Sequence, residues 1–177
     1  MTVSLRPERP PDSADVRELH RVAFGEAGEV VADLVDDLRT DDDTFSLVAE
    51  DDGAVVGSVL FVPGLLDARR RLVPVRTLSP LAVLPGRQRQ GIGSALVRAG
   101  LREMADRGVP VVFVEGDPAY YRRLGFVAGA GLGFRRPSLR IPEAAFQAVL
   151  LPAHEPWMTG THVYAEAFWR HDAVGLR

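Results

Sequence analysis

A glycine-containing turn between a predicted strand and a predicted helix constrains this chain more than any other feature. It lies in the segment Leu81-Ala-Val-Leu-Pro-Gly-Arg-Gln-Arg-Gln-Gly-Ile-Gly-Ser-Ala-Leu96. The apolar run from Val75 to Val83 predicts a central strand, and the spacing from Gly91 to Arg107 predicts a helix. The first amides of a helix have no acceptors within it and carry the positive end of its dipole. The turn is therefore suited to bind a diphosphate.

Two familiar phosphate-binding motifs do not fit this turn. It lacks the Gly-Lys-Ser/Thr ending of a Walker loop. Three positions after Gly93 stands Leu96, where a dinucleotide fingerprint has glycine or alanine. Because Gly-x-Gly alone is common, a tight connection without any ligand remains an alternative.

Composition excludes several classes of function. The chain has 177 residues, 46% of them apolar, which suits one domain over residues 1–177. A net charge of -3 gives no basic field, so neither nucleic acid nor a membrane surface is expected as a partner. The absence of cysteine excludes thiolate chemistry, and the four histidines lack metal-ligand spacing, so no metal is expected. No apolar leader is evident, which predicts a cytoplasmic protein.

The remaining segments predict alternating helices and strands. Two amphipathic helices come early in the chain. His20 is expected on the polar side of the first. The second is expected to have a solvated face, made by Asp33, Asp36, Asp37 and Arg39. A hairpin and a second turn, over Leu65 to Val73, follow. The predicted segments are a strand at Thr2–Arg6, helices from Asp12 or Ser13 to Gly25 and around Val31–Leu38, strands at Phe45–Ala49, Val55–Val62 and Val111–Val114, a short helix at Pro118–Leu124, and weaker strands near Leu132–Phe134, Phe146–Leu151 and His162–Ala165.

The turn resembles the acyl-CoA loop of the GNAT superfamily of N-acyltransferases, which follows Gln/Arg-x-x-Gly-x-Gly/Ala. Gln88-Arg-Gln-Gly-Ile-Gly93 matches that pattern at every specified position. A second family motif, Tyr-x-x-x-Gly-Phe, is matched by Tyr121-Arg-Arg-Leu-Gly-Phe126. Similarity to the YhbS-like branch extends further, to Ser46–Ala49, Val56–Gly57, Gly116–Tyr121 and Tyr164–Phe168.

The resemblance implies an α/β (α+β) fold in a single GNAT-like domain. Its central mixed, mostly antiparallel sheet would have about seven strands, one parallel βαβ unit, a splay at the acyl-CoA cleft and helices on both faces. It also implies N-acetyl transfer from acetyl-CoA to a primary amine by direct attack in a ternary complex. The amine would belong to a small molecule or a protein, and a homodimer through the final strands is left open.

The family also implies roles for individual residues. Tyr121 matches the general acid, with packing against the sheet as its alternative and as the expected role of Tyr120. Many relatives carry a glutamate on the strand before the loop, but Thr77 to Val83 contains no acid. Glu115 and Asp117 are therefore candidate bases, with Glu26 behind them and with capping or solvation as the alternative.

The resemblance also implies that a backbone N–H of the strand before the loop, from Leu81 or Ala82, stabilises the oxyanion. Arg87 and Arg89 are candidates for charge-assisted contacts to the phosphates, with a solvated loop position as the alternative for each. The residues expected to bind CoA are Leu81, Ala82, Val83, Gln88, Arg89, Gln90, Gly91, Ile92, Gly93 and Ser94.

Two other functions stay open at this stage. The missing strand acid permits an acyl-CoA-binding sensor without catalysis, and a nucleotide-binding domain of another α/β family remains possible. The sequence does not identify the acceptor amine, because the acceptor pockets of this fold resemble one another little.

Overall fold

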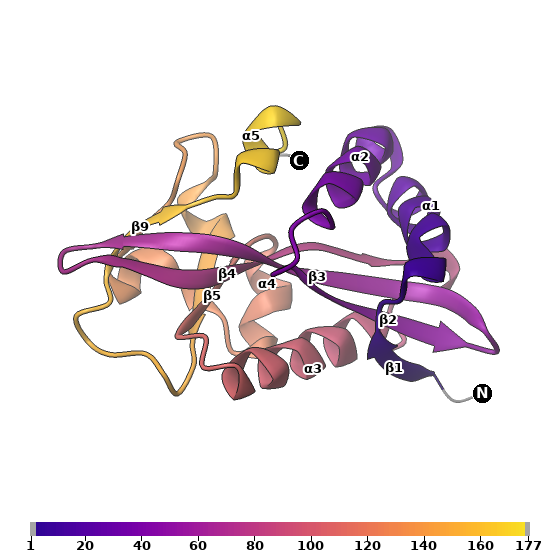
Figure 1. Ribbon diagram of the computed structural model, residues 1–177, viewed down its shortest axis with the longest axis horizontal. Helices are drawn as coiled ribbons and strands as arrows, with labels where there is room; N and C mark the ends of the chain where they lie inside the picture. The colour runs from indigo at the N-terminus through magenta and orange to yellow at the C-terminus, as the bar shows by residue number, and fades with distance from the viewer. Residues whose placement is uncertain (1–2, 176–177) are drawn as a thin grey trace. The chain divides into compact units, whose positions relative to one another are not determined.

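The computed structural model describes residues 3–175, so Thr2 of the predicted first strand lies outside the described chain. The chain divides into two compact units, which are described separately. Unit 1 comprises residues 3–61 and 79–100, and unit 2 comprises residues 62–78 and 101–175. Two long strands, β3 (Ala54–Ala68) and β4 (Leu72–Val83), contribute residues to both units (Figure 1).

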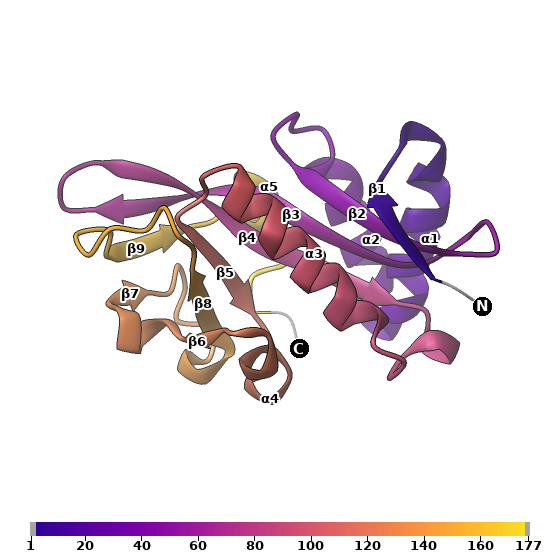
Figure 2. The same cartoon turned by 90° about the horizontal axis from the view of Figure 1, so that it is seen from below.

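Unit 1 is a layered α/β structure. Its strands follow the order β1-β2-β3-β4, and the β1/β2 and β2/β3 pairs are antiparallel. Helices α1 and α2 cover one face of these strands and α3 covers the other, as both views show (Figures 1 and 2). The elements not yet bounded are β1 (Ser4–Pro7), α1 (Ser13–Ala23), α2 (Gly28–Leu38), β2 (Phe45–Asp51) and α3 (Ile92–Asp106).

A close approach of backbones fixes α3 against β3. A Cβ added at Gly57 of β3 would come within 3.0 Å of Ile92 Cγ2 and 3.1 Å of Leu96 Cδ1. At Gly100 of α3 the added atom would lie 2.0 Å from the ring of Phe61. A methyl group at Gly57 would require the Ile92 and Leu96 side chains to move by a few tenths of an ångström, and one at Gly100 would displace the buried Phe61 ring.

His20 does not lie on the polar side of α1, and the sequence-based prediction was wrong. Its side chain is fully buried with those of Val16 and Leu19, because positions i, i+3 and i+4 of a helix share one face. Neither ring nitrogen has a hydrogen-bond partner. Burial, with the nearby Arg39 cation as a second cause, lowers the pKa of His20 to about 3, so the imidazole is neutral.

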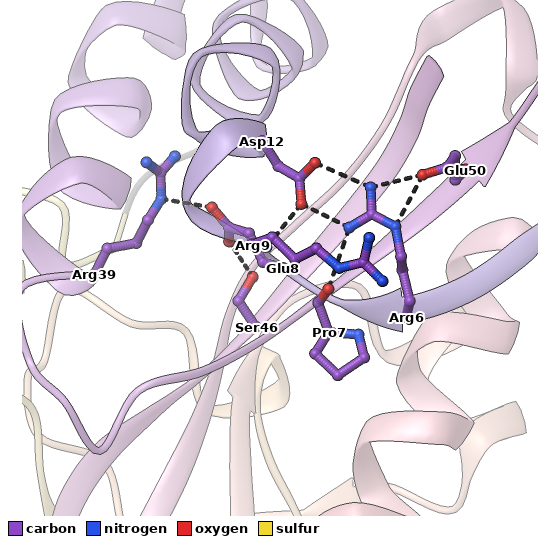
Figure 3. Close-up of polar contacts among 8 residues, drawn as sticks. All are labelled: Arg6, Pro7, Glu8, Arg9, Asp12, Arg39, Ser46 and Glu50. Atoms are coloured by element: carbon purple, nitrogen blue, oxygen red, sulfur yellow. Dashed lines mark hydrogen bonds and ion pairs between the residues drawn. The ribbon is translucent and has the colours of Figure 1, made fainter. Parts of the chain in front are cut away.

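A chain of ion pairs joins β1 to its neighbours (Figure 3). Arg6 lies between two carboxylates, with 2.6 Å from its guanidinium to Asp12 and 2.6 Å to Glu50. The hydrogen bond from Arg6, with a smaller contribution from the Arg9 amide, lowers the pKa of Asp12 to about 2. Arg39, expected on a solvated face, instead lies 3.2 Å from the buried carboxylate of Glu8.

Unit 2 contains the remaining strands and two short helices. Its strands follow the order β3-β4-β5-β8-β6, with β9 beside β3 and β7 beside β9. The β4/β5 and β7/β9 pairs are parallel, and the others for which a register is known are antiparallel. The new elements are β5 (Val111–Glu115), α4 (Pro118–Tyr121), β6 (Val127–Ala128), β7 (Phe134–Arg135), β8 (Phe146–Leu150), β9 (Gly160–Val163) and α5 (Glu166–Arg170).

The predicted α/β class, with mixed strands and one β4-α3-β5 unit, is confirmed. The second turn is much shorter than predicted, because β3 continues to Ala68 and β4 begins at Leu72. The strand predicted near Leu132–Phe134 overlaps β7, whereas β6 and α5 were missed. The described chain has nine strands where about seven were expected. Single 3-10 turns occupy Pro10–Asp12, Gly25–Ala27, Pro85–Arg87, Arg122–Leu124, Gly129–Leu132 and Glu143–Ala145.

Over residues 3–175, none of the helices combines the length and the apolar character needed to cross a membrane.

The buried neutral His20 predicts a pH dependence of stability. Its pKa is about 3 when folded and 6.5 in the reference state, so between these values the unfolded chain binds the extra proton. The free energy of unfolding should therefore rise with pH between about 3 and 6.5. Above pH 6.5, His20 should add no further pH dependence. His20→Leu should reduce that slope by about 1.4 kcal/mol per pH unit, measured by urea unfolding between pH 4 and 7. An unchanged slope would contradict a neutral buried imidazole.

Candidate functional site

The turn before α3 presents backbone amides at the surface of unit 1. The first backbone hydrogen bond of the helix runs from Ala95 N–H to Gly91 O, at 2.9 Å. The amides of Ile92, Gly93 and Ser94 consequently have no acceptor inside the helix. Residues 88–91 are exposed, so the tip of the helix is not covered by its own loop. The helix start is thus open to an anionic group.

Left-handed backbone shapes this turn. Gly91 has φ +85°, and Arg89 has φ +60°. An added Cβ at Gly91 would meet no heavy atom within 4 Å, so glycine is needed here for conformation and not to avoid a protein contact. The open space beside Gly91 is what a ligand that approaches the backbone closely requires.

The side chains of the turn leave that space clear. Gln88 Nε2 donates to Val83 O at 3.1 Å, and Gln90 Nε2 donates to Gly86 O at 3.3 Å. Arg87 is held by the buried carboxylate of Asp51 at 2.6 Å, while Arg89 is exposed. Of the two arginines expected near phosphates, Arg87 pairs with Asp51, and Arg89 is the one that lies exposed at the turn.

The strand segment that leads into the turn alternates in exposure. Leu81 and Val83 are half-buried and Ala82 is 3% exposed, as expected where successive side chains point to opposite faces. Leu84 N–H donates to Val56 O at 3.0 Å, which ties the end of this segment to β3. Pro80 has no N–H to offer a neighbouring strand.

Three candidate proton-transfer residues lie together in unit 2, where β5 leads into α4. Asp117 is the N-cap of α4, and its Oδ1 accepts the Ala119 N–H at 2.8 Å. Glu115 ends β5, and its Oε2 accepts from Tyr164 at 3.3 Å. The third candidate base, Glu26, is exposed in a 3-10 turn of unit 1.

The Tyr121 side chain is buried against neighbouring rings, and its phenol stays protonated. The side chain is 8% exposed, and its ring stands edge-on to Phe126 at 5.4 Å and to Tyr120 at 5.0 Å. A Cβ at Gly116 would lie 2.4 Å from the Tyr121 ring, so only glycine fits beside it. Burial raises the pKa of Tyr121 far above its usual value, with Tyr120 as a smaller cause, so the hydroxyl is protonated at neutral pH.

His162 and Tyr164 form a buried polar pair that sequence reasoning missed. The His162 ring stacks on Phe113 at 4.1 Å and places Nε2 3.1 Å from Thr77 Oγ1. Burial lowers the pKa of His162 to about 3, so this imidazole is neutral. The available signal was the spacing of two, because residues two apart in extended chain share a face, and Tyr164 directly follows β9.

No group of three or more potential metal ligands occurs between residues 3 and 175.

Comparison with protein families gives a match to the acetyltransferase (GNAT) family over residues 13–126. Two proteins of Escherichia coli strain K12 are similar to the chain. The uncharacterized N-acetyltransferase YjhQ is 36% identical over 156 residues, which cover 84% of each chain. The uncharacterized N-acetyltransferase YhbS is 38% identical over 147 residues, which cover 81% of this chain and 84% of that protein.

Two solved structures resemble the chain in fold. The Escherichia coli YhbS structure, in complex with CoA, has a TM-score of 0.85 at 34% identity, covering 95% of this chain and 92% of that one. A GNAT family acetyltransferase from Brucella melitensis, in complex with acetyl-CoA, has a TM-score of 0.76 at 32% identity. That match covers 94% of this chain and 98% of the other.

Proposed function

We propose that this chain, which belongs to the acetyltransferase (GNAT) family, transfers an acetyl group from acetyl-CoA to a primary amine. The sequence-based assignments to this family and to the acyltransferases are confirmed. One observation carries the proposed reaction: an exposed turn with φ +85° at Gly91 opens a helix whose first amides lack acceptors within it. Such a turn suits the diphosphate of CoA.

The similar proteins support CoA as the carrier. YhbS has been crystallised with CoA and the Brucella melitensis protein with acetyl-CoA, and both cover more than nine-tenths of this chain. We assign the pyrophosphate to the amides of Gln88 to Ser94 and the pantetheine arm to the backbone of Leu81, Ala82 and Val83. The N–H of Leu81 or Ala82 would stabilise the oxyanion.

Transfer requires one bond to form and one to break. The neutral amine nitrogen attacks the thioester carbon, the C–N bond forms, and the C–S bond then breaks. Tyr121, whose phenol is protonated at neutral pH, donates a proton to the departing sulfur. The proton that leaves the amine passes to a carboxylate, and we favour Glu115 because the Asp117 side chain already caps α4.

A CoA-binding sensor without catalysis is the second candidate, because residues 77–83 of β4 contain no carboxylate. A single domain, a cytoplasmic location and a homodimer stay predictions.

Release of free CoA in the presence of a panel of primary amines distinguishes the two functions. The panel should include alkylamines, amino acids and peptides with free N-termini. The chain has no cysteine, so a thiol reagent reports CoA without a protein background. Amine-dependent release above hydrolysis supports the transferase, whereas tight CoA binding with no release on the whole panel supports the sensor.

Gly91→Ala should weaken CoA binding about tenfold, measured by calorimetry. The left-handed backbone costs a residue with a Cβ about 1–2 kcal/mol, so the turn should shift and its amides should lose their alignment. Gly108→Ala is the matched control, because Gly108 has φ +73° and an equally open surrounding beyond the other end of α3. Equal loss of CoA affinity in both variants would contradict the assigned site.

Tyr121→Phe should lower kcat about 100-fold and leave CoA affinity unchanged, because it removes only the proton donor. Tyr120→Phe removes a neighbouring phenol assigned to packing and should retain wild-type kcat. Wild-type kcat in Tyr121→Phe would refute the acid role.

A further inference from the structure

The end of β5 places Glu115 on a defined face of unit 2. Pairing between β4 and β5 runs from Arg76 and Val112 to Leu78 and Val114, so Glu115 is the first residue beyond the parallel ladder. Alternation along a strand puts Glu115 on the same face as Phe113. Against that face lies the His162 ring, stacked on Phe113 at an interplanar angle of 14°.

Tyr164 is held on two sides so that its hydroxyl reaches Glu115. The Tyr164 ring stands edge-on to His162, with centroids 4.9 Å apart at 89°, and lies 4.8 Å from Phe168. The side chain is 7% exposed, and its hydroxyl donates to Glu115 Oε2 at 3.3 Å. Packing of the ring therefore fixes the direction of the hydroxyl before any substrate binds.

The C-terminal segment supplies a second donor to the same oxygen. Gly175 N–H donates to Glu115 Oε2 at 3.4 Å. Gly175 has φ +75°, and an added Cβ would lie 3.0 Å from Arg140 Cβ and from Arg140 O. Val174, just before it, is 2% exposed, which holds the segment in place. Both donors to Oε2 are neutral, and together they fix the direction of this oxygen.

We infer that Tyr164 is a positioning residue, which, with the Gly175 amide, orients Glu115 to accept the proton of the acceptor amine. The inference rests on the proposed function. It assigns a role to Tyr164, a residue that the proposed reaction does not otherwise involve. The phenol suits the role of a hydrogen-bond donor. Burial, with the charge of Glu115 as a smaller cause, raises the pKa of Tyr164 well above 10. It consequently stays a donor at neutral pH.

A double-mutant cycle on kcat tests the coupling, with the most active amine of the panel. Tyr164→Phe should lower kcat about tenfold, the worth of one hydrogen bond to a charged group, while the Gly175 amide still contacts the carboxylate. Glu115→Gln should lower kcat about 100-fold or more. In the Glu115→Gln background, Tyr164→Phe should cost nothing further, because its effect passes through the carboxylate.

Structural damage gives a different pattern. Tyr164→Phe should keep the CoA affinity of the wild type, and Trp169→Phe, which alters another ring near Tyr164, should keep wild-type kcat. Independent losses in the double variant, or wild-type kcat in Tyr164→Phe, would overturn the inference while the wild-type enzyme still transfers. An inactive wild type that binds CoA would instead overturn the proposed function itself.

Discussion

The left-handed backbone at Gly91 is the constraint on which the proposed binding site depends. It lets the chain leave β4 and begin α3 beside open space, with the first amides of the helix lacking acceptors within it. The helix is held in that place by contact of Gly57 with Ile92 and Leu96, and of Gly100 with Phe61. Close packing of α3 on β3 therefore fixes the position of the amides, and the glycine turn keeps them accessible.

A single physical effect sets the protonation of three rings in unit 2. Burial disfavours the charged form of each group, which keeps His162 neutral and both Tyr121 and Tyr164 protonated. The protonated Tyr164 hydroxyl is thus a neutral donor at the end of β5, where it contacts Glu115. A protonated Tyr121 is what the proposed acid role at neutral pH requires, because the acid must hold its proton.

Local patterns predicted most of the elements. The two early helices, the hairpin, the buried strand at residues 111–114 and the helix after the glycine turn follow from apolar spacing and turn residues. The region 65–73 was misread because its arginines suggested a long turn. Its buried residues Leu66, Ala68 and Val73 in fact keep the alternation of strands. The strands β6 and β7 have two residues each, too few to show any period.

By itself, the sequence determined the family, the glycine turn and the candidate CoA-binding backbone, because these depend on residues within a few positions of one another. Only the tertiary structure decided which distant groups meet. Tyr164 and Glu115 are 49 residues apart, and Thr77 and His162 are 85 apart. No local pattern encodes such contacts. The neutrality of His20 and His162 was also decided at that level, because desolvation depends on what packs around a ring and not on its neighbours in sequence.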